Sequence, residues 1–338
     1  MKIKSKNIIS LKKKYLRKRR SKTRHKTKSF ALFSKILFLI FILSEIKFDI
    51  SLYKLIINKF GKKSTTKVCL CLIIKKENLY LKFFVEHYRH LGYDHIYLYD
   101  NNDINDERVE DVIKKYINNG FITVIDYRGF KGPKSNTQMV AYYDCYEKHN
   151  NEYDWLSFFD IDEYLILKPK GIRIQNFLDN ERYKDCPNIK INWLYYSDNN
   201  KIKYEEKPLT RRFTEVSKWK IDNRHIKSIM RGNISYKKYK KTKIPHYLYY
   251  KLKSCSSSGK LDEGTYFIEP PDYEYAILNH YILTITEFVN KMKRGRADMK
   301  FIYNQEFLNS YFDRYFNICD KTEEKVKIFN KAFNTSFK

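Results

Sequence analysis

A regular alternation of strand-length and helix-like hydrophobic patterns between residues 68 and 159 constrains this fold more than any other feature. Val68–Ile74 is a continuous apolar run, which is typical of a strand buried on both faces. Helical spacing of apolar residues follows over 79–91 and ends before Gly92, a common helix stop. Further strand patterns occupy 95–99, 121–125 and 155–159, and further helical patterns occupy 107–117 and 136–148. This alternation predicts βαβ units and an α/β fold with a mostly parallel central sheet.

Polar residues follow each predicted strand, and a parallel sheet brings such residues together because ligands bind beyond the carboxyl ends of its strands. These polar segments are Lys75–Glu77, Asp100–Asp103, Asp126 and Asp160–Asp162. They predict one crevice rich in carboxylates and amides. The sequence has neither a Gly-x-Gly-x-x-Gly motif after the first strand nor a Walker A motif, so a phosphate bound there would need a different partner.

The sequence Asp160-Ile-Asp-Glu163 offers that partner in the form of a metal ion. Residues i and i+2 at a strand end project to the same side, so Asp160 and Asp162 are predicted to reach one cation. Carboxylates with water suit Mg²⁺ or Mn²⁺, which keep coordination positions open for diphosphate oxygens. The place of this motif, at the end of the fourth predicted strand, favours a metal site over a solvated acidic turn.

The amino-terminal region combines a dense basic segment with an apolar one. The chain has a formal net charge of +28, and residues 1–28 supply half of it with fourteen Lys or Arg and no acid. Residues 30–43 are apolar except for one Ser and one Lys. By the positive-inside rule this predicts a cytosolic tail over 1–28, a signal anchor over 29–46 and a stem over 47–66. The alternatives are an amphipathic segment on an anionic surface and a core helix behind a disordered tail.

The predicted anchor implies a single-pass type II membrane protein. Its body would lie in the Golgi or ER lumen of a eukaryote, or on a host membrane or virion if the source is viral. The remaining positive charge is scattered Lys beside abundant Ile, Asn and Tyr, a composition typical of AT-rich genomes. The strongest basic run, Leu11–Lys28, contains only one aromatic residue, whereas nucleic-acid binding favours interleaved aromatics. A membrane is therefore a predicted partner and nucleic acid is not.

The six cysteines form no Cys-x-x-Cys pair and no zinc-ligand spacing. Cys69 and Cys71 are two residues apart in the first predicted strand, so we expect them to share one face as packing residues. The other four are candidates for disulfides if the body is lumenal, although their spacing does not choose the pairs. They are Cys145, Cys186, Cys255 and Cys319.

Several motifs occur in a fixed order along the chain. In the first half they read Val68…Lys75-Lys-Glu77, His87-Tyr-Arg-His-Leu-Gly-Tyr93, Tyr99-Asp-Asn-Asn102, Gln138-Met-Val-Ala-Tyr-Tyr-Asp-Cys145 and Trp155-Leu-Ser-Phe-Phe-Asp-Ile-Asp-Glu-Tyr164. In the second half they read Asn192-Trp-Leu-Tyr-Tyr-Ser197, Arg211-Arg-Phe-Thr214, Lys227-Ser-Ile229, Leu278-Asn-His-Tyr281, Glu287-Phe, Lys291 and Arg294-Gly295. From residue 67 to residue 296, this order resembles glycosyltransferase family 92 and related family 2-like enzymes, which are nucleotide-diphospho-sugar transferases with the GT-A fold. Two positions depart from the family's pattern: Lys76 stands where it has Asn, and Tyr196 where it has Gly.

The resemblance implies a GT-A catalytic domain over 67–300. It divides into a nucleotide-binding half at 67–168 and an acceptor half at 169–300, and a C-terminal helical extension is expected over 301–338. The implied activity is that of a metal-dependent hexosyltransferase. It would move a sugar, with galactose as the first choice, from a UDP-sugar to a glycan or glycoconjugate hydroxyl with inversion. The expected cofactor is Mn²⁺ or Mg²⁺, and the expected partners are the nucleotide-sugar donor and the glycan acceptor.

The resemblance also implies roles for individual residues. As catalytic residues, Asp162 would bind the metal directly, Asp160 would bind it through water or hold the ribose and sugar hydroxyls, and Glu163 would assist them. His280 is the first choice for an additional metal ligand, and His246 is the second. The donor is expected to contact Lys75, Glu77, Asp100, Asn101, Asn102, Gln138, Lys227 and Arg294, with Arg231 as a further diphosphate contact. The general base stays open among Glu215, Asp198, Asp222, Asp262 and Glu263.

Two other functions stay open at this point. A catalytically inactive, membrane-anchored module that binds glycans or nucleotides would keep the same fold, and metal-dependent donor hydrolysis distinguishes it from an enzyme. A metal-dependent phosphatase also uses an Asp-x-Asp motif, but there the motif closes the first strand and precedes Thr or Val. Here the motif closes the fourth predicted strand, and Glu163-Tyr164 follows.

Overall fold

The computed structural model of this chain describes residues 64–132, 136–234, 240–241, 245–246, 249–250, 253–263, 266–295 and 305–336. The predicted tail and anchor, and the predicted stem up to residue 63, lie outside these residues. None of the helices described here is both long enough and apolar enough to span a bilayer. All of the elements below belong to one unit, Lys62–Lys338.

The first half of the described chain is a parallel sheet with helical crossovers, as predicted. Its strands are β1 (Val68–Ile74), β2 (His95–Asp100), β3 (Ile122–Asp126) and β4 (Trp155–Phe158). The hydrogen-bonded order is β3-β2-β1-β4, and each neighbouring pair is parallel. The crossover helices are α4 (Asn78–Leu91), α5 (Glu110–Asn118) and α6 (Thr137–His149).

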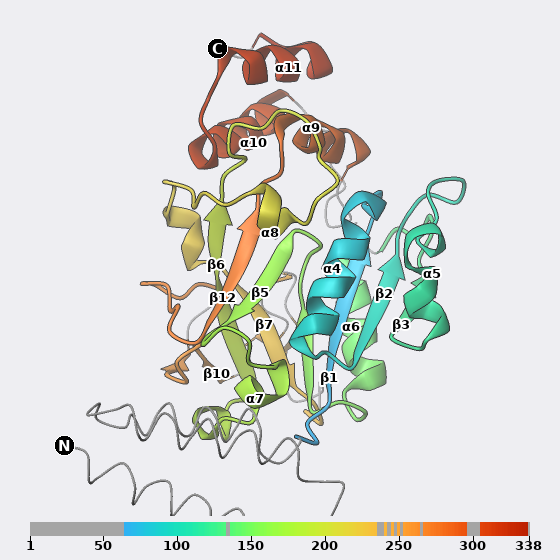
Figure 1. Ribbon diagram of the computed structural model, residues 1–338, viewed down its shortest axis with the longest axis vertical. Coiled ribbons are helices and arrows are strands. Elements are labelled where there is room, and N and C mark those ends of the chain that lie inside the picture. Colours follow the sequence, from blue (N-terminus) through green and yellow to red (C-terminus); the bar gives the residue numbers. More distant parts are fainter. Residues whose placement is uncertain are drawn as a thin grey trace, which may run out of the picture. The chain divides into compact units, whose positions relative to one another are not determined.

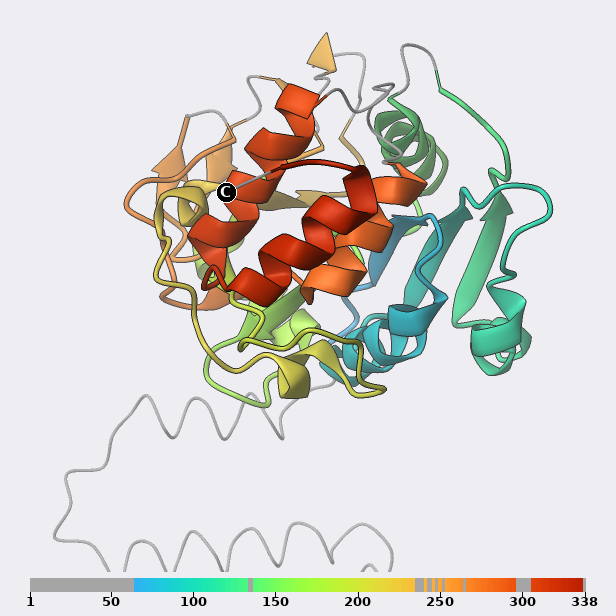
Figure 2. The same cartoon turned by 90° about the horizontal axis from the view of Figure 1, so that it is seen from above.

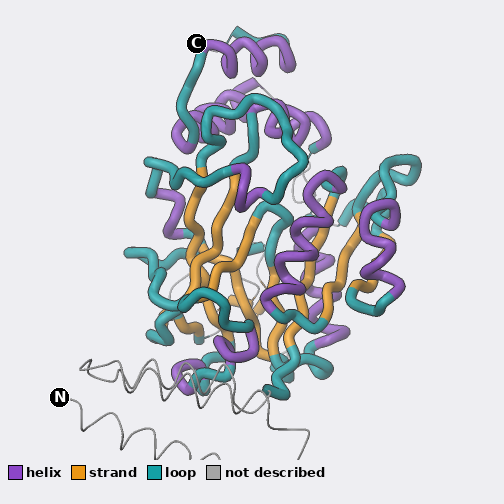
Figure 3. The backbone as a smooth tube through the Cα atoms, viewed as in Figure 1, coloured by secondary structure: helices purple, strands orange, loops and turns teal. Residues whose placement is uncertain are grey.

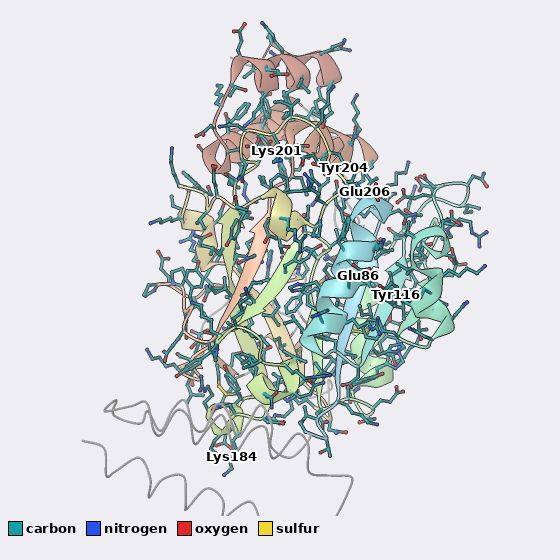
Figure 4. All side chains as sticks on the ribbon, viewed as in Figure 1. Glu86, Tyr116, Lys184, Lys201, Tyr204 and Glu206 are labelled. Atoms are coloured by element: carbon teal, nitrogen blue, oxygen red, sulfur yellow. A yellow bond between two sulfur atoms is a disulfide. The ribbon has the colours of Figure 1, made fainter. Side chains whose placement is uncertain are left out.

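Strand β1 lies at the centre of the core because both of its faces are covered. Its even-numbered residues belong to the apolar cluster that includes α4 and α5, and its odd-numbered residues pack with α6. Figure 1 shows α4 in front of the sheet and α6 behind it. Helices α4 and α5 also contact each other, since the Tyr116 hydroxyl donates to the Glu86 carboxylate at 3.1 Å (Figure 4). The continuous apolar run of β1 is therefore explained by a layer of helices on each side.

The second half of the sheet is mixed, so the prediction of a mostly parallel sheet holds only for the first half. Its elements are β5 (Glu163–Leu167), α7 (Ile174–Leu178), η2 (Glu181–Tyr183), β6 (Asn188–Tyr196), α8 (Leu209–Arg212), η3 (Ile221–Arg224), β7 (Ile226–Arg231), β10 (Ser254–Cys255), β11 (Leu261–Asp262) and β12 (Ala276–Tyr281), with a separate pair of β8 (Lys240–Lys241) and β9 (Tyr249–Tyr250). Strand β7 runs antiparallel between β4 and β6, and β12 pairs antiparallel with β5 and parallel with β6. The connection from β6 to β7 contains the short helices α8 and η3, of four residues each. Figure 3 shows the strands grouped at the centre with helices around them.

Three C-terminal helices lie above the carboxyl ends of β6 and β12, as Figures 1 and 2 show. They are α9 (Ile285–Arg294), α10 (Gln305–Ile318) and α11 (Glu323–Phe333). Helix α9 begins with a capping box, in which the side chains of Thr284 and Glu287 accept each other's backbone N–H groups. The buried Lys325 ammonium of α11 lies 2.7 Å from the Asp198 carboxylate, to which the Tyr315 hydroxyl of α10 also donates. These buried contacts fix α10 and α11 on the body.

Two disulfide bonds join elements that are distant in the sequence. The pairs are Cys71–Cys145, between β1 and α6, and Cys186–Cys255, between the segment after η2 and β10. Cys69 and Cys71 share one face of β1 as predicted, but the interpretation of Cys71 as a packing residue only is wrong. Cys319 is free and buried, and its sulfur accepts the Asp198 N–H. The pairs were not predictable because 74 and 69 residues separate the partners, and only the folded sheet brings them together.

Candidate functional site

A cavity of about 270 Å³ lies beyond the carboxyl ends of β1 and β4, where the sequence predicts the site. The β4–β5 turn, β6, β12, α6, α9 and α10 contribute to its wall. Its ionisable and amide side chains are Lys75, Glu77, Gln138, Asp160, Asp162, His225, His246, His280, Lys291, Arg294 and Arg314. The acids come from the first half of the chain, whereas most of the cations come from α9 and α10. A ligand in this cavity therefore meets both signs of charge.

Asp160 is held in place by three donors from α6 and β7. Its Oδ1 accepts hydrogen bonds from Gln138 at 2.6 Å and from the Tyr142 hydroxyl at 3.0 Å, and its Oδ2 lies 2.8 Å from the Lys227 ammonium. Burial raises the pKa of Asp160, but Lys227, His246 and Lys291 together outweigh the effect of burial, so the pKa falls below its usual range. Asp160 is therefore an ionised carboxylate with a fixed orientation at neutral pH.

Asp162 lies between a cation and an imidazole. Its Oδ2 accepts a hydrogen bond from the Lys291 ammonium at 2.5 Å, and its Oδ1 lies 3.7 Å from Nε2 of His280. The register of β12 against β5 brings His280 opposite Glu163, next to Asp162 in the chain. Burial lowers the pKa of His280 to about 4, so its ring is neutral at pH 7, which is the form that binds metals. Burial raises the pKa of Asp162, but Lys291 and His280 bring it below its usual value, so an ionised carboxylate faces a neutral imidazole.

Glu163 lies behind these two aspartates and is fully buried. Its Oε2 accepts the Asp160 N–H at 2.9 Å and lies 3.6 Å from the Lys227 ammonium. Burial raises the pKa of Glu163 well above its usual value. Glu163 is not among the residues that line the cavity, so its geometry is that of a positioning residue for the Asp160 backbone.

One wall of the cavity is aromatic. The Trp193 ring of β6 lies 4.4 Å from the His280 ring and 4.8 Å from the His246 ring, measured between centroids. The Tyr195 ring stacks on His280 at 4.6 Å, and its hydroxyl accepts a hydrogen bond from Arg314 at 3.1 Å. This packing fixes the orientation of the imidazole that faces Asp162.

Similarity to known proteins assigns the family. Residues 64–244, more than half of the chain, match the model of Glycosyltransferase family 92. This chain belongs to glycosyltransferase family 92. The matched region of the family 92 chain includes β1, α6, the Asp160–Glu163 turn and Lys227.

Curated relatives of this family 92 chain come from plants, and all three carry the family name. The protein from Ricinus communis is 24% identical over 115 residues, which are 34% of this chain and 20% of the relative. The protein from Oryza sativa subsp. japonica is 22% identical over 127 residues, which are 38% of this chain and 20% of the relative. The protein from Arabidopsis thaliana is 26% identical over 127 residues, which are 36% of this chain and 21% of the relative. The matched segment thus spans about a fifth of the length of these relatives.

Two solved structures show a distant likeness to this chain. The mannosyltransferase PcManGT from Pyrobaculum calidifontis, in complex with GDP-Man and Mn²⁺, has a TM-score of 0.26 and 9% identity, with 41% of this chain and 42% of that chain covered. TarS from S. aureus has a TM-score of 0.33 and 12% identity, and the likeness covers 79% of this chain and 49% of TarS. Likenesses at this level do not transfer a substrate or a mechanism.

The structure brings together many of the predicted site residues of the family 92 chain, but not all of them. Lining residues are Lys75, Glu77, Gln138, Asp160, Asp162, His246, His280 and Arg294. Arg294 binds the Glu77 carboxylate at 2.5 Å. Lys227 lies behind the cavity, where it is completely buried against Asp160. Arg231 lies elsewhere: its guanidinium stacks over the Trp155 ring at 4.2 Å and donates to the Tyr183 carbonyl.

The predicted nucleotide contacts after β2 are instead occupied in holding a loop. Asp100 lies 3.2 Å from the Arg128 guanidinium, and Asn101 donates to the carbonyls of Tyr127 and Phe130. Asn102 accepts the Lys76 N–H at 2.6 Å. None of these three side chains lines the cavity among the described residues. Lys76 itself has a left-handed φ of 51°, a conformation that the Asn of the family pattern adopts more easily.

Several lining or supporting residues were not assigned a role from the sequence, and their signal was weak. Tyr142 lies four residues after Gln138, on the same face of α6, and Lys291 lies three residues before Arg294 on α9. Both spacings are visible only once the partner residue is known to belong to the site. Trp193, Tyr195 and Arg314 carry no such spacing.

The five general-base candidates separate in the structure. Asp198 is buried in an ion pair with Lys325, and Asp262 pairs with Lys190. Glu215 and Glu263 are exposed and are not among the residues that line the cavity. Asp222 lines a second, larger cavity between η3 and α10.

Proposed function

We propose that this chain is a GT-A-type, metal-dependent glycosyltransferase that transfers a sugar from a UDP-sugar to a hydroxyl of a glycan or glycoconjugate. The observation that carries the proposal is the Asp160–Asp162 turn at the carboxyl edge of the parallel strands. There the two ionised carboxylates face Lys227, Lys291 and His280. This combination suits a diphosphate and its counter-ion. Galactose is still the first choice of donor sugar, and inversion of the anomeric configuration is still the expected stereochemical outcome. Both expectations rest on the family resemblance alone.

Asp162 and His280 would hold the metal. An ionised carboxylate and a neutral imidazole nitrogen 3.7 Å apart suit Mn²⁺, and two protein ligands leave positions open for diphosphate oxygens. Within the described residues, no group of three or more His, Cys, Asp or Glu side chains is arranged to hold a metal ion. The substrate would therefore have to complete the site. When bound, the ion would withdraw charge from the diphosphate leaving group.

The chain's own residues would position and neutralise the donor. Lys291 and Arg294 project from one face of α9 and offer cations to the diphosphate, whose oxygens suit a guanidinium fork. Gln138 and Tyr142 fix the Asp160 carboxylate, which can then accept from ribose or sugar hydroxyls without reorienting. Trp193 and Tyr195 would cover one side of the bound donor.

The first test offers the full chain a panel of UDP- and GDP-sugars with Mn²⁺ or with EDTA and measures the release of free nucleotide. We expect release from one donor, and we expect EDTA to abolish it. UDP binding without release from any donor would point to the inactive binding module of the same fold. Absence of both release and UDP binding would contradict the enzyme assignment.

We also propose that the predicted segment over 29–46 anchors the chain in a membrane as a type II protein. The two disulfide bonds of the body support this, because disulfides form and persist in oxidising compartments such as the ER lumen. Membranes from cells that express the full chain should retain it during alkaline carbonate extraction. Recovery of the protein in the carbonate supernatant would contradict a spanning anchor.

A further inference from the structure

A second cavity, of about 730 Å³, lies between η3 and α10 and is separate from the metal-binding residues. His225 and Arg314 line both cavities, so the two adjoin. The remaining lining is polar and aromatic, with Trp219, Asp222, Glu306 and Asp313 as its principal side chains. Figure 1 shows α10 above the carboxyl ends of β6 and β12.

Trp219 gives this cavity a rigid aromatic surface. Its indole N–H donates to Oδ2 of Asp222 at 3.1 Å, and the same oxygen accepts from Nε of Arg314 at 2.9 Å. The other two tryptophans, Trp155 and Trp193, are buried with 2% and 4% exposure, whereas Trp219 is only partly buried. A partly exposed ring whose polar edge is already satisfied presents its apolar face to a ligand.

The charge of this cavity is opposite to that of the chain. The chain carries a net charge of +28, yet the cavity contains three carboxylates against one guanidinium. Asp222 is paired with Arg314, and neither Glu306 nor Asp313 has an ion-pair partner among the described residues. Such a surface repels phosphates and uronic acids by like charge, and its carboxylates accept hydrogen bonds from hydroxyl groups.

Three consecutive side-chain contacts connect this cavity to Asp162 in the first cavity. Arg314 donates to the Tyr195 hydroxyl at 3.1 Å, Tyr195 stacks on His280, and His280 faces Asp162. A ligand seated on Trp219 would therefore extend along a common wall toward the place where the donor is proposed to react.

We propose that the cavity between η3 and α10 binds the acceptor as a neutral glycan, stacked on Trp219. The role as acceptor site rests on the proposed transferase function, whereas the preference for a neutral saccharide rests on the cavity alone. Helix α10 lies beyond residue 300, so this proposal extends the acceptor region past the 169–300 segment expected from the sequence.

The test measures direct binding of saccharides to the full chain by saturation-transfer NMR and tryptophan fluorescence. The probes are trisaccharides of galactose, glucose, mannose and N-acetylglucosamine, with trigalacturonate as the acidic counterpart. We expect at least one neutral trisaccharide to bind, trigalacturonate to bind at least about tenfold more weakly, and Trp219→Ala to weaken neutral binding roughly tenfold or more. Trp219→Phe should keep most of the affinity because it keeps an aromatic face.

The matched control is Ile221→Ala, which removes an exposed apolar side chain of η3 that does not line the cavity. It should leave saccharide binding unchanged. The double variant Glu306→Gln/Asp313→Asn should reduce the difference in binding affinity between the neutral trisaccharides and trigalacturonate. Failure of every neutral probe to bind, equal binding of trigalacturonate, or unchanged binding by Trp219→Ala would overturn the proposal.

An assay of nucleotide release distinguishes failure of the acceptor site from failure of the proposed transferase activity. If a donor is hydrolysed but Trp219→Ala leaves the acceptor KM unchanged, the acceptor site fails while the transferase stands. If saccharides bind through Trp219 but no donor releases nucleotide, the saccharide site stands and the transferase role fails. Ile221→Ala should leave donor hydrolysis in the absence of acceptor unchanged, since Ile221 lines neither cavity.

Discussion

Asp162→Asn is expected to lower the rate of sugar transfer by roughly a thousandfold, because it removes the charge that would bind the metal and so loses several kcal/mol of transition-state stabilisation. The substitution keeps the size of the side chain. It also leaves the Lys291 ammonium, 2.5 Å from Oδ2, without its carboxylate. The measurements are kcat from nucleotide release with Mn²⁺, and the free Mn²⁺ signal in electron paramagnetic resonance, which reports metal binding without turnover.

Asp126→Asn is the matched control for this prediction. Asp126 ends β3 at the same edge of the sheet, is exposed, accepts the Arg128 N–H at 2.9 Å and does not line the cavity. Its substitution should change activity by no more than about twofold, as expected for a surface position. An Asp162→Asn protein that binds Mn²⁺ and turns over like Asp126→Asn would contradict the role assigned to Asp162.

The contrast between these two aspartates shows how far the sequence could predict the site. Each strand end in the first half was predictable, because a buried parallel strand reads as a short apolar run followed by polar residues. The order of the strands in the sheet was not predictable, because hydrophobic periodicity does not indicate which strands are neighbours. The chain proceeds from β1 outward through β2 to β3 and then returns to the other side of β1 with β4. The crevice lies at this switch point, between β1 and β4, and the residues after β2 and β3 lie away from it.

The second half of the site depends on pairings that the sequence does not encode locally. His280 reaches Asp162 because β12 pairs antiparallel with β5, in a register that places it opposite Glu163. Lys291 and Arg314 reach the same cavity from α9 and α10, whose positions are fixed by buried contacts such as Lys325 with Asp198. His280 was predicted only through the family resemblance of its motif, and a lone Lys in a chain with 67 Lys and Arg carries no local signal of such a role.

Lys227→Met is expected to lower the free energy of unfolding by about 1–3 kcal/mol, less than the usual cost of breaking a fully buried ion pair, because the Asp160 side chain is 34% exposed and water screens its charge. Lys227 is fully buried, and its ammonium lies 2.8 Å from Asp160 and 3.6 Å from Glu163. Methionine preserves most of the apolar stem but leaves the partly buried Asp160 carboxylate without its cation. Urea denaturation of the full chain at neutral pH measures the loss. Lys82→Met, on the exposed face of α4, is the control and should change stability by less than about 0.5 kcal/mol.

The pH dependence of this loss has a definite sign. The pKa of Asp160 is lowered in the folded state, so its contribution to stability is present above the unfolded pKa of about 4 and disappears as the pH falls through the folded value. The pKa of Lys227 is raised, so its contribution is present below about 10.4 and disappears as the pH rises through the folded value. Both contributions are complete at neutral pH. The stability difference between wild type and Lys227→Met should therefore be largest near neutrality and shrink on acidification.

The double variant Asp160→Asn/Lys227→Met tests whether the two charges act as a pair. Asparagine removes the uncompensated charge while it keeps an oxygen that can accept from Gln138 and Tyr142. We therefore expect the double variant to be more stable than Lys227→Met alone, with a coupling energy within the range of about 0.5–3 kcal/mol that residues in direct contact show. Additive losses would mean that Lys227 stabilises the fold through its packing and not through Asp160. In that case the fixed orientation of Asp160 would have to come from Gln138 and Tyr142 alone.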